Sequence, residues 1–282
     1  MYQTLISVDE LIENIEDPNW VIVDCRFSLA DPDSGRNDYR MSHVPNAYYA
    51  HLDDALSGEI VPGSTGRHPL PTIEAAEATF SSWGIDSKTQ VVVYDQGHGG
   101  IAARLWWMLN WLGHSKVAVL DGGWAQWIEN SGPVTSEPPE YATQIQFTAA
   151  PNPDLWIDVS EVEAICRSGN SLLIDSRTSP RYQGLEEPID PVAGHIPGAV
   201  NSPFVDNLLD GKFDSAEALK ARFENILGDF NPDQTIFYCG SGVTACHNVL
   251  AVKHAGLGMA KIFPGSWSQW IADPKRSIST SD

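Results

Sequence analysis

The chain has 282 residues, which at about 150 residues per domain favours two domains, and 42% of them are hydrophobic, which excludes intrinsic disorder as the main state. A formal net charge of −20 disfavours binding to nucleic acid or to an anionic membrane, because both are negatively charged themselves. No apolar run approaches the ~18 residues of a spanning helix, no signal peptide is readable, and the four cysteines are too scattered for a disulfide framework. These features predict a soluble, cytoplasmic protein.

The first half of the chain alternates short apolar runs with longer helical stretches. A capping box of Ser7 and Glu10 predicts a helix start near the N-terminus. The predicted strands and helices that follow are strands at 21–23, 91–93 and 117–120, and helices at 73–83 and 101–112. Continuous apolar strands that alternate with helices are typical of a parallel sheet covered on both faces.

A proline-rich stretch follows, and its prolines would interrupt both helices and strand ladders. They are Pro133, Pro138, Pro139, Pro151 and Pro153. The predicted organisation is therefore a first domain over 1–132, a linker over 133–153 and a second domain over 154–282.

The second half repeats the pattern of the first. Ser160 and Glu163 form a second candidate capping box. The predicted elements that follow are strands at 172–174, 236–238 and 262–263, and helices at 216–227 and 245–255.

Four sequence motifs recur in the same order in both halves, which indicates an internal duplication. The matching stretches are 20–26 with 172–177, 43–47 with 195–199, 91–95 with 235–239, and 121–127 with 264–270. Chance similarity would not preserve that order, so the chain contains two copies of one unit.

The third apolar strand of each half ends in a glycine-bearing loop that opens a helix, at the edge of the sheet where α/β proteins bind ligands. In the second half this loop begins at Cys239 and continues as Gly-Ser-Gly-Val-Thr to residue 244. Converging backbone N–H groups and a helix N-terminus favour the thiolate form of such a cysteine, which makes it a nucleophile. The first half has Asp95 at the matching position, and a carboxylate cannot carry a transferable sulfur atom. Only the second copy is expected to be active.

These motifs resemble those of the tandem rhodanese-domain sulfurtransferases over nearly the whole chain. The carrying stretches are Asp-x-Arg after a strand, Gly-His-Ile-Pro-Gly at 194–198, Cys-Gly-Ser-Gly-Val-Thr-Ala-Cys at 239–246 and Gly-Ser-Trp at 265–267. The resemblance implies an α/β fold of two rhodanese-like domains, each a doubly wound, mainly parallel sheet with helices on both faces. It also implies a silent first domain.

The same resemblance implies a two-step reaction in which Cys239 takes a sulfane sulfur from a small donor. The persulfide then passes it to a small thiol, cyanide or a thioredoxin-like acceptor. The outer sulfur would be held by the backbone amides of Gly240, Gly242, Val243 and Thr244, with Ser241 among them. No cofactor and no metal are expected.

The loop form Cys-Gly-Ser-Gly-Val-Thr resembles the 3-mercaptopyruvate enzymes, whereas thiosulfate-preferring relatives place basic side chains after the cysteine. Arg181 matches the family arginine that binds the anionic group of the donor. The second arginine that mercaptopyruvate enzymes carry before Gly194 is missing, so thiosulfate stays open as the alternative donor. An ion pair of Arg181 with Glu186 or Glu187 is the competing interpretation.

By the same resemblance, a polar relay of Ser241, His68 and Asp53 would lie beside the cysteine, in a cleft between the domains. His68 is equally compatible with an ordinary loop residue. The other cysteines, Cys25, Cys166 and Cys246, are interpreted as packing residues.

Two rival functions have sequence support. The glycines after residue 95 and the acid Asp121 imitate a dinucleotide-binding fingerprint, which leaves a nucleotide-binding oxidoreductase as a remote alternative. A cysteine phosphatase would need an arginine six residues after Cys239, and that residue is Ala245.

Overall fold

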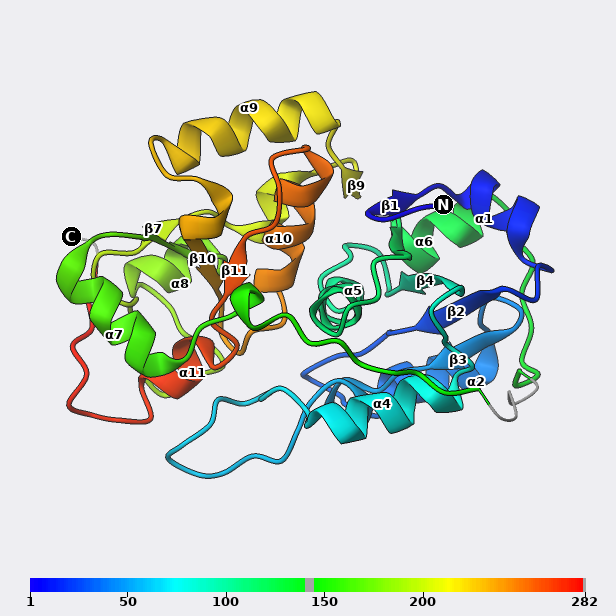
Figure 1. Cartoon of the computed structure of the whole chain (residues 1–282), viewed down its shortest axis with the longest axis horizontal. Coiled ribbons are helices and arrows are strands. Elements are labelled where there is room, and N and C mark those ends of the chain that lie inside the picture. The colour runs from blue at the N-terminus through cyan, green and yellow to red at the C-terminus, as the bar shows by residue number, and fades with distance from the viewer. Residues whose placement is uncertain (140–144, 281–282) are drawn as a thin grey trace. The chain divides into compact units, whose positions relative to one another are not determined.

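The computed structural model describes residues 1–139 and 145–280, which form two compact units (Figure 1). Unit 1 comprises Met1–Gly58 and Leu70–Asn152, and unit 2 comprises Glu59–Pro69 and Pro153–Asp282. The segment Glu59–Pro69, called the strap below, therefore packs as part of unit 2 although it interrupts unit 1 in the sequence. Of the predicted linker, residues 140–144 lie outside the described residues, and the predicted domain boundaries stay a prediction.

Unit 1 is built on a five-stranded parallel sheet with the strand order β1-β5-β4-β2-β3. Its strands are β1 (Leu5–Ile6), β2 (Trp20–Asp24), β3 (Ala47–Tyr49), β4 (Gln90–Tyr94) and β5 (Val117–Leu120). Every residue of β4 is buried, as expected of a strand in the middle of a covered sheet. The three strands predicted for this half are present, and β1 and β3 are additional.

The helices of unit 1 flank this sheet. They are α1 (Val8–Asn14), α2 (Ser34–Met41), α3 (Leu52–Ala55), α4 (Ile73–Ser82), α5 (Ala102–Trp111) and α6 (Gly123–Glu129). The predicted capping box is confirmed at the start of α1, where Ser7 and Glu10 satisfy each other's backbone N–H groups. Helix α5 is buried along nearly its whole length, so it belongs to the core of the unit.

Unit 2 repeats this architecture with a four-stranded parallel sheet of order β11-β10-β6-β7 and a small antiparallel hairpin. Its strands are β6 (Leu172–Asp175), β7 (Val200–Asn201), β10 (Thr235–Tyr238), β11 (Lys261–Ile262) and the hairpin strands β8 (Leu208–Leu209) and β9 (Lys212–Phe213). A parallel bridge from Trp156 to Ile262 takes the place that β1 has beside β5 in unit 1. The duplication read from the sequence is therefore present in the order of the strands.

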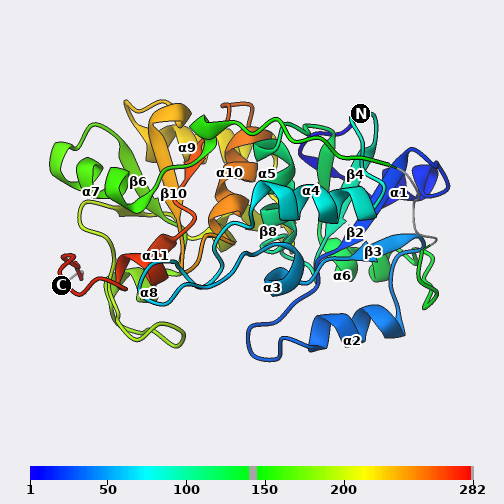
Figure 2. The ribbon, with the colours of Figure 1, turned by 60° about the horizontal axis from the view of Figure 1, so that its bottom comes forward.

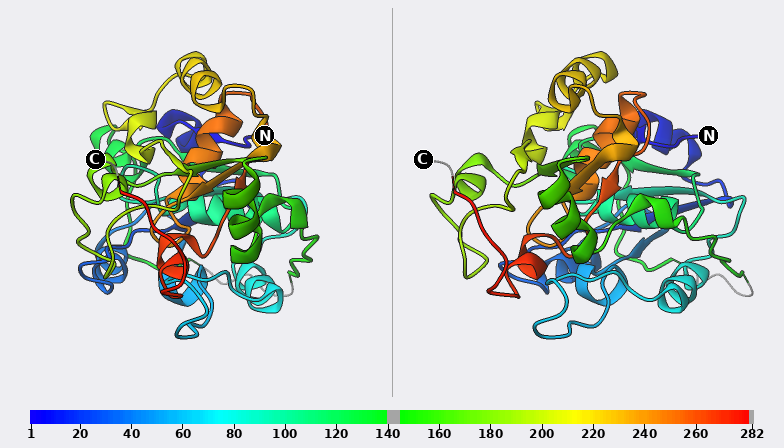
Figure 3. Two further views of the ribbon diagram at one scale, coloured as in Figure 1. Left: turned by 90° about the vertical axis from the view of Figure 1, so that its left-hand side faces the viewer. Right: turned by 60° about the vertical axis from the view of Figure 1, so that its left-hand side comes forward.

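The helices of unit 2 are α7 (Val159–Ser168), α8 (Ser179–Gln183), α9 (Ala216–Leu227), α10 (Ala245–His254) and α11 (Ser266–Trp270), with short 3-10 turns at Pro153–Leu155, Phe204–Asn207 and Pro232–Gln234. Helices α9 and α10 pack together at one side of the unit, in yellow and orange in Figure 3. Both units thus have the predicted class, a doubly wound parallel sheet flanked by helices.

The start of α7 corrects one prediction. Its N-cap is Asp158 rather than Ser160, and the capping box pairs Asp158 with Glu161 at 2.9 Å in both directions. The residues on either side of this box, Ile157 and Val162, are both buried in the core of unit 2, as in a hydrophobic staple. The apolar pair therefore selects the earlier cap, and the Ser160 hydroxyl only donates to Asp158.

The duplicated Asp-x-Arg motif makes the same contacts in both units. Asp24 pairs with Arg26 in unit 1, and Asp175 pairs with Arg177 in unit 2 at 2.6 Å between Oδ2 and Nη2, all four side chains being buried. Each guanidinium lies over a tryptophan ring, 4.4 Å from the centre of Trp124 or 4.8 Å from that of Trp267. Because both copies have the same arrangement, the motif stabilises the fold in both units.

The strap has no helix or strand of its own and is fixed to unit 2 by hydrogen bonds to the start of α11. Ser64 O accepts from Gln269 Nε2 at 2.6 Å, and Ser268 Oγ accepts from the backbone N–H of Arg67 at 3.0 Å. Gly66 lies so close to Gly265 that a Cβ atom there would be 2.4 Å from its carbonyl oxygen. Figure 2 shows the strap in light blue and cyan alongside α11.

Candidate active site

Cys239 is the first residue after β10, and five loop residues separate it from α10. Its Sγ atom accepts a hydrogen bond from the backbone N–H of Gly242 at 3.2 Å, and the residue is 2% exposed. Gly242 has a φ of +78°, and a Cβ atom there would lie 2.2 Å from the Pro264 carbonyl oxygen. Glycine is therefore required for the loop to turn its amides toward the sulfur.

The backbone N–H and carbonyl of Cys239 are held by the first two residues of α11. Ser266 Oγ accepts from the Cys239 N–H at 3.0 Å, and the N–H of Trp267 donates to the Cys239 carbonyl at 3.0 Å. Ser266 is buried and has a φ of +52°, an uncommon conformation for a residue with a side chain. This local strain places a hydroxyl under the cysteine, which sequence reasoning did not anticipate.

His68 and Ser241, which the sequence predicted as relay partners, lie together. His68 Nδ1 and Ser241 Oγ form a 2.7 Å hydrogen bond, and both residues are buried. The strap carries His68 and the cysteine loop carries Ser241. Asp53, the third predicted partner, is an exposed residue of α3 in unit 1, and its part in a relay stays a prediction.

The remaining predicted loop residues complete the turn into α10. Gly240 and Val243 are buried and Thr244, half-buried, precedes the first residue of the helix. The Gly240 carbonyl accepts from the N–H of Ser268 at 2.9 Å. The loop therefore has one face bonded to the 263–268 segment.

Arg181 forms an ion pair with Glu187, which was the alternative to donor binding in the sequence analysis. Its Nη2 lies 2.7 Å from Glu187 Oε1 and 3.3 Å from Asp190 Oδ2, and its Nε donates to both oxygens of Glu187 at 3.1 Å. Burial would raise the pKa of Glu187, but the hydrogen bonds from Arg181 and from the backbone of Asp190 outweigh it and lower that pKa. The role of Arg181 in donor binding stays a prediction.

A second guanidinium stands beside it, from a residue that the sequence analysis did not single out. A Cβ atom at Gly240 would lie 3.1 Å from Arg67 Nη2 and 3.5 Å from Arg181 Nη2. Arg67 comes from the strap, next to His68, and forms an ion pair with Asp190. Gly240, which follows Cys239, therefore lies against two arginines and has no basic side chain of its own.

In unit 1 the matching loop contains Asp95 in place of the cysteine. Its carboxylate accepts four backbone hydrogen bonds from its own loop: from Gly97 and Gly99 to Oδ1 at 3.0 and 2.9 Å, and from Ile101 and Ala102 to Oδ2 at 2.9 and 3.2 Å. This loop geometry binds an anion, as expected of consecutive amides at a helix N-terminus. These amides, which the dinucleotide fingerprint would assign to a phosphate, are bonded to the protein's own carboxylate.

The other cysteines have different surroundings. Cys246 is buried in the first turn of α10 and its thiol donates to the Gly242 carbonyl at 3.4 Å. Burial raises the pKa of the Cys25 thiol well above its usual value. The buried surroundings of Cys25 therefore disfavour a thiolate.

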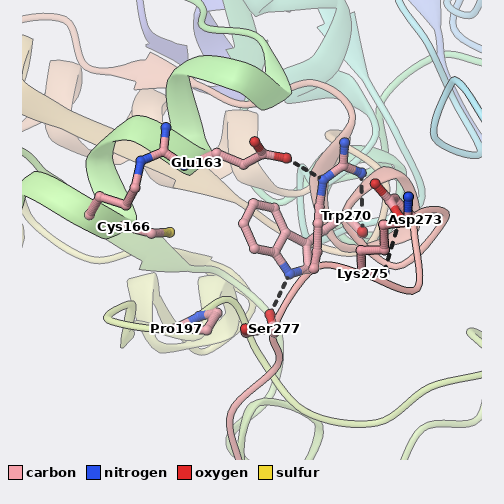
Figure 4. Close-up of a pocket in the computed structure, with 9 residues that line it drawn as sticks. Glu163, Cys166, Pro197, Trp270, Asp273, Lys275 and Ser277 are labelled. Carbon is pink, nitrogen blue, oxygen red and sulfur yellow. Dashed lines mark hydrogen bonds and ion pairs between the residues drawn. The ribbon is translucent and has the colours of Figure 1, made fainter.

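Cys166 lines a pocket of about 460 Å3 between α7 and the segment after α11 (Figure 4). Glu163 forms an ion pair there with Arg276 at 2.7 Å, and the Trp270 ring N–H donates to the Ser277 carbonyl at 2.9 Å. Partial burial raises the pKa of the Cys166 thiol. The pocket contains none of the predicted site residues, and its cysteine is less ionised than a free one.

Comparison with known proteins gives a consistent picture. A family model described as the rhodanese-like domain matches residues 7–130 and 158–273. The chain is 41% identical to a probable 3-mercaptopyruvate sulfurtransferase of Pseudomonas aeruginosa over 99% of this chain and 98% of that protein. It is 37% identical to the putative thiosulfate sulfurtransferase SseB of Mycobacterium tuberculosis, over 98% and 96%.

Among solved structures, the chain is similar to the 3-mercaptopyruvate sulfurtransferase from Leishmania major. The TM-score is 0.81 at 32% identity, over 94% of this chain and 73% of that one. In the described part of the chain, no helix combines the length and the apolar character that crossing a membrane requires.

Proposed function

Because this chain belongs to the rhodanese family and is a tandem-domain sulfurtransferase, we propose that Cys239 is its sulfur carrier. One observation carries the proposal: Cys239 Sγ accepts the Gly242 N–H inside a loop whose counterpart in unit 1 encloses a carboxylate with four N–H groups. A loop with this geometry stabilises an anionic sulfur. The amides of Gly240 to Thr244 would hold the outer sulfur of the persulfide.

The proposed donor is 3-mercaptopyruvate. The Cys239 thiolate attacks the donor sulfur, an S–S bond forms, and the carbon–sulfur bond breaks with its electron pair left on the carbon. That carbon then takes up a proton and leaves as pyruvate. In the second step a nucleophile attacks the outer sulfur and Cys239 leaves as the thiolate. A small thiol, cyanide or a thioredoxin-like protein can serve as this acceptor.

Ser241 and His68 are suited to the proton transfer that the first step requires. Their 2.7 Å hydrogen bond links a hydroxyl of the cysteine loop to an imidazole, the side chain that enzymes most often use for proton transfer. We assign them the relay that moves a proton toward the donor's carbon. Asp53 is the third member of this relay by the family resemblance alone.

The choice of donor depends on charge near the cysteine. Gly240 and Ser241 are neutral, which disfavours a loop built for the thiosulfate dianion, and Arg181 provides a planar fork for a single carboxylate. Thiosulfate is the second candidate because the arginine that mercaptopyruvate enzymes carry before Gly194 is missing here. Steady-state assays with both donors side by side decide between them through kcat/KM. A cytoplasmic location remains part of this proposal on compositional grounds.

The carrier is tested by mass spectrometry of the protein after treatment with each donor and removal of excess donor. One extra sulfur atom is expected on the peptide that contains Cys239. Cys239→Ser should lower transfer from either donor by at least about a thousandfold, as loss of a nucleophile does in other enzymes. Cys246→Ser is the matched control, seven residues away in the same loop and helix, and should keep most activity. An equal loss in both variants, or the extra sulfur on another cysteine, would refute the assignment.

A further inference from the structure

We propose that Asp190 is an internal anion that occupies the place where the anionic group of the sulfur donor binds, so that the donor must displace it from two arginines. The inference rests on the proposed function, since it concerns the donor of that reaction. It makes Asp190 a residue that sets donor affinity, and Arg67 the second arginine of the donor site.

The first observation is the shared carboxylate. Arg67 bonds to Asp190 Oδ1, and Arg181 Nη2 bonds to Asp190 Oδ2 at 3.3 Å. A Cβ atom at Gly240 would lie 3.7 Å from Asp190 Oδ2, so this carboxylate stands beside the residue that follows the nucleophile. Two guanidiniums already bind one carboxylate, that of Asp190, next to Cys239. The same arrangement suits the carboxylate of a small donor.

The second observation is unused donor capacity on Arg67. A guanidinium has five N–H groups, and the Nε of Arg67 is buried without an acceptor among the described residues. A buried donor without an acceptor costs free energy, which a bound anion can recover. The Arg67 side chain is 26% exposed, so solutes can reach it.

The third observation separates Asp190 from its neighbour Glu187. Glu187 bonds to Arg177 and Arg181 and accepts the backbone N–H groups of residues 189 and 190 at 3.1 Å each. Glu187 therefore fixes the turn, whereas the Asp190 side chain bonds only to the two site arginines in the contacts that the structure gives it. Asp190 can release its arginines without the turn coming apart.

The charges also balance. Arg67 and Arg181 repel each other, and Asp190 and Glu187 bring the cluster to formal neutrality. Exchange of the Asp190 carboxylate for the donor's carboxylate leaves the net charge around the arginines unchanged. The donor thus gains only the difference between two similar ion pairs, which lowers its affinity.

The test is Asp190→Asn, which keeps the shape of the side chain and removes its charge. The KM for 3-mercaptopyruvate and for thiosulfate should fall by about three- to tenfold, with the change in KM rather than in kcat. Glu186→Gln serves as the control. It removes one charge from an exposed side chain four residues before Asp190. It should change KM by less than about twofold, as expected of a screened surface charge.

A second readout does not depend on turnover. Calorimetric binding of pyruvate, an inert carboxylate, should tighten in Asp190→Asn by the same factor and stay unchanged in Glu186→Gln. Arg67→Ala should weaken pyruvate binding about tenfold or more. If Asp190 only positions the arginines, Asp190→Asn will weaken pyruvate binding and raise KM. A KM that rises or stays unchanged, or pyruvate binding that weakens or stays unchanged, overturns the inference.

The outcomes separate this inference from the proposed function. Pyruvate binding that fails to tighten, together with a persulfide on Cys239 in both proteins, refutes the role of Asp190 alone. Absence of the persulfide from the unmodified enzyme with both donors refutes the proposed carrier, while the binding measurement still decides whether Asp190 competes for the anion site.

Discussion

The loop that follows β4 in unit 1 and the loop that follows β10 in unit 2 enclose different side chains. In unit 1 the loop closes on Asp95, whose carboxylate accepts four backbone N–H groups. In unit 2 the same position holds Cys239, whose sulfur accepts one N–H, from Gly242. The duplicated loop thus encloses a carboxylate of the chain in one unit and a cysteine sulfur in the other, where we propose that it holds a transferable sulfur.

The sharpest way to break this comparison is Gly242→Ala. The added Cβ would lie 2.2 Å from the Pro264 carbonyl oxygen at a φ of +78°, so the loop must open and its N–H must leave the sulfur. We expect kcat/KM to fall by about a hundredfold or more, comparable to the loss of a donor to a developing anion. Steady-state kinetics with either donor measures this loss.

Gly97→Ala in the loop of unit 1 is the control for Gly242→Ala. A Cβ at Gly97 meets its nearest neighbour, the Ala125 side chain, at 3.7 Å, which is ordinary contact. Activity within about twofold of the parent enzyme is expected, because no close contact is created. A comparable loss in both variants would show that the two loops are not functionally distinct.

Asp95→Ala tests the structural half of the comparison. Four N–H groups would lose their acceptor in a buried loop, so unit 1 should lose about 3 kcal/mol of unfolding free energy. Calorimetric unfolding should show an earlier transition, whereas kcat of the folded enzyme stays close to that of the parent. An unchanged transition would mean that the carboxylate does not stabilise the loop.

A smaller effect is expected from Ser241→Ala. The loop of unit 1 has Gly97 at the matching position and hence no hydroxyl, so the serine is present in the second copy only. Loss of the hydroxyl that bonds to His68 should lower kcat about tenfold, at the low end for a proton relay, and shift its pH profile. An unchanged kcat and profile would reduce the Ser241–His68 contact to packing.

Most of the fold could be predicted from the sequence because its signals are local. Apolar runs marked β2, β4, β6 and β10 to within a residue or two, and the order of motifs revealed the duplication. The cap of α7 was wrong because Asp158 and Ser160 both have an acid three residues later, and only the packing of Ile157 with the core separates them.

Sequence signals point to a site residue where it follows a strand or matches a motif, as Cys239 and Arg181 do, and both stay predictions. Arg67 and Asp190 were not predicted because their ion pair joins residues 123 positions apart, and neither lies in a periodic stretch or in a motif shared by the two halves. The one available signal was that Arg67 adjoins His68. Ser266 escaped as well, because an uncommon backbone conformation leaves no mark in composition.

The strap has a consequence for how this protein can be divided. A fragment that begins at Pro153 would contain Cys239 but not Arg67 or His68, since both come from the interruption of unit 1. Such a fragment would lack the Ser241–His68 hydrogen bond and the Arg67–Asp190 ion pair. A cut between the two halves of the sequence therefore does not coincide with the boundary between the two folded units, and recombinant expression of the C-terminal half alone is expected to yield an incomplete unit 2.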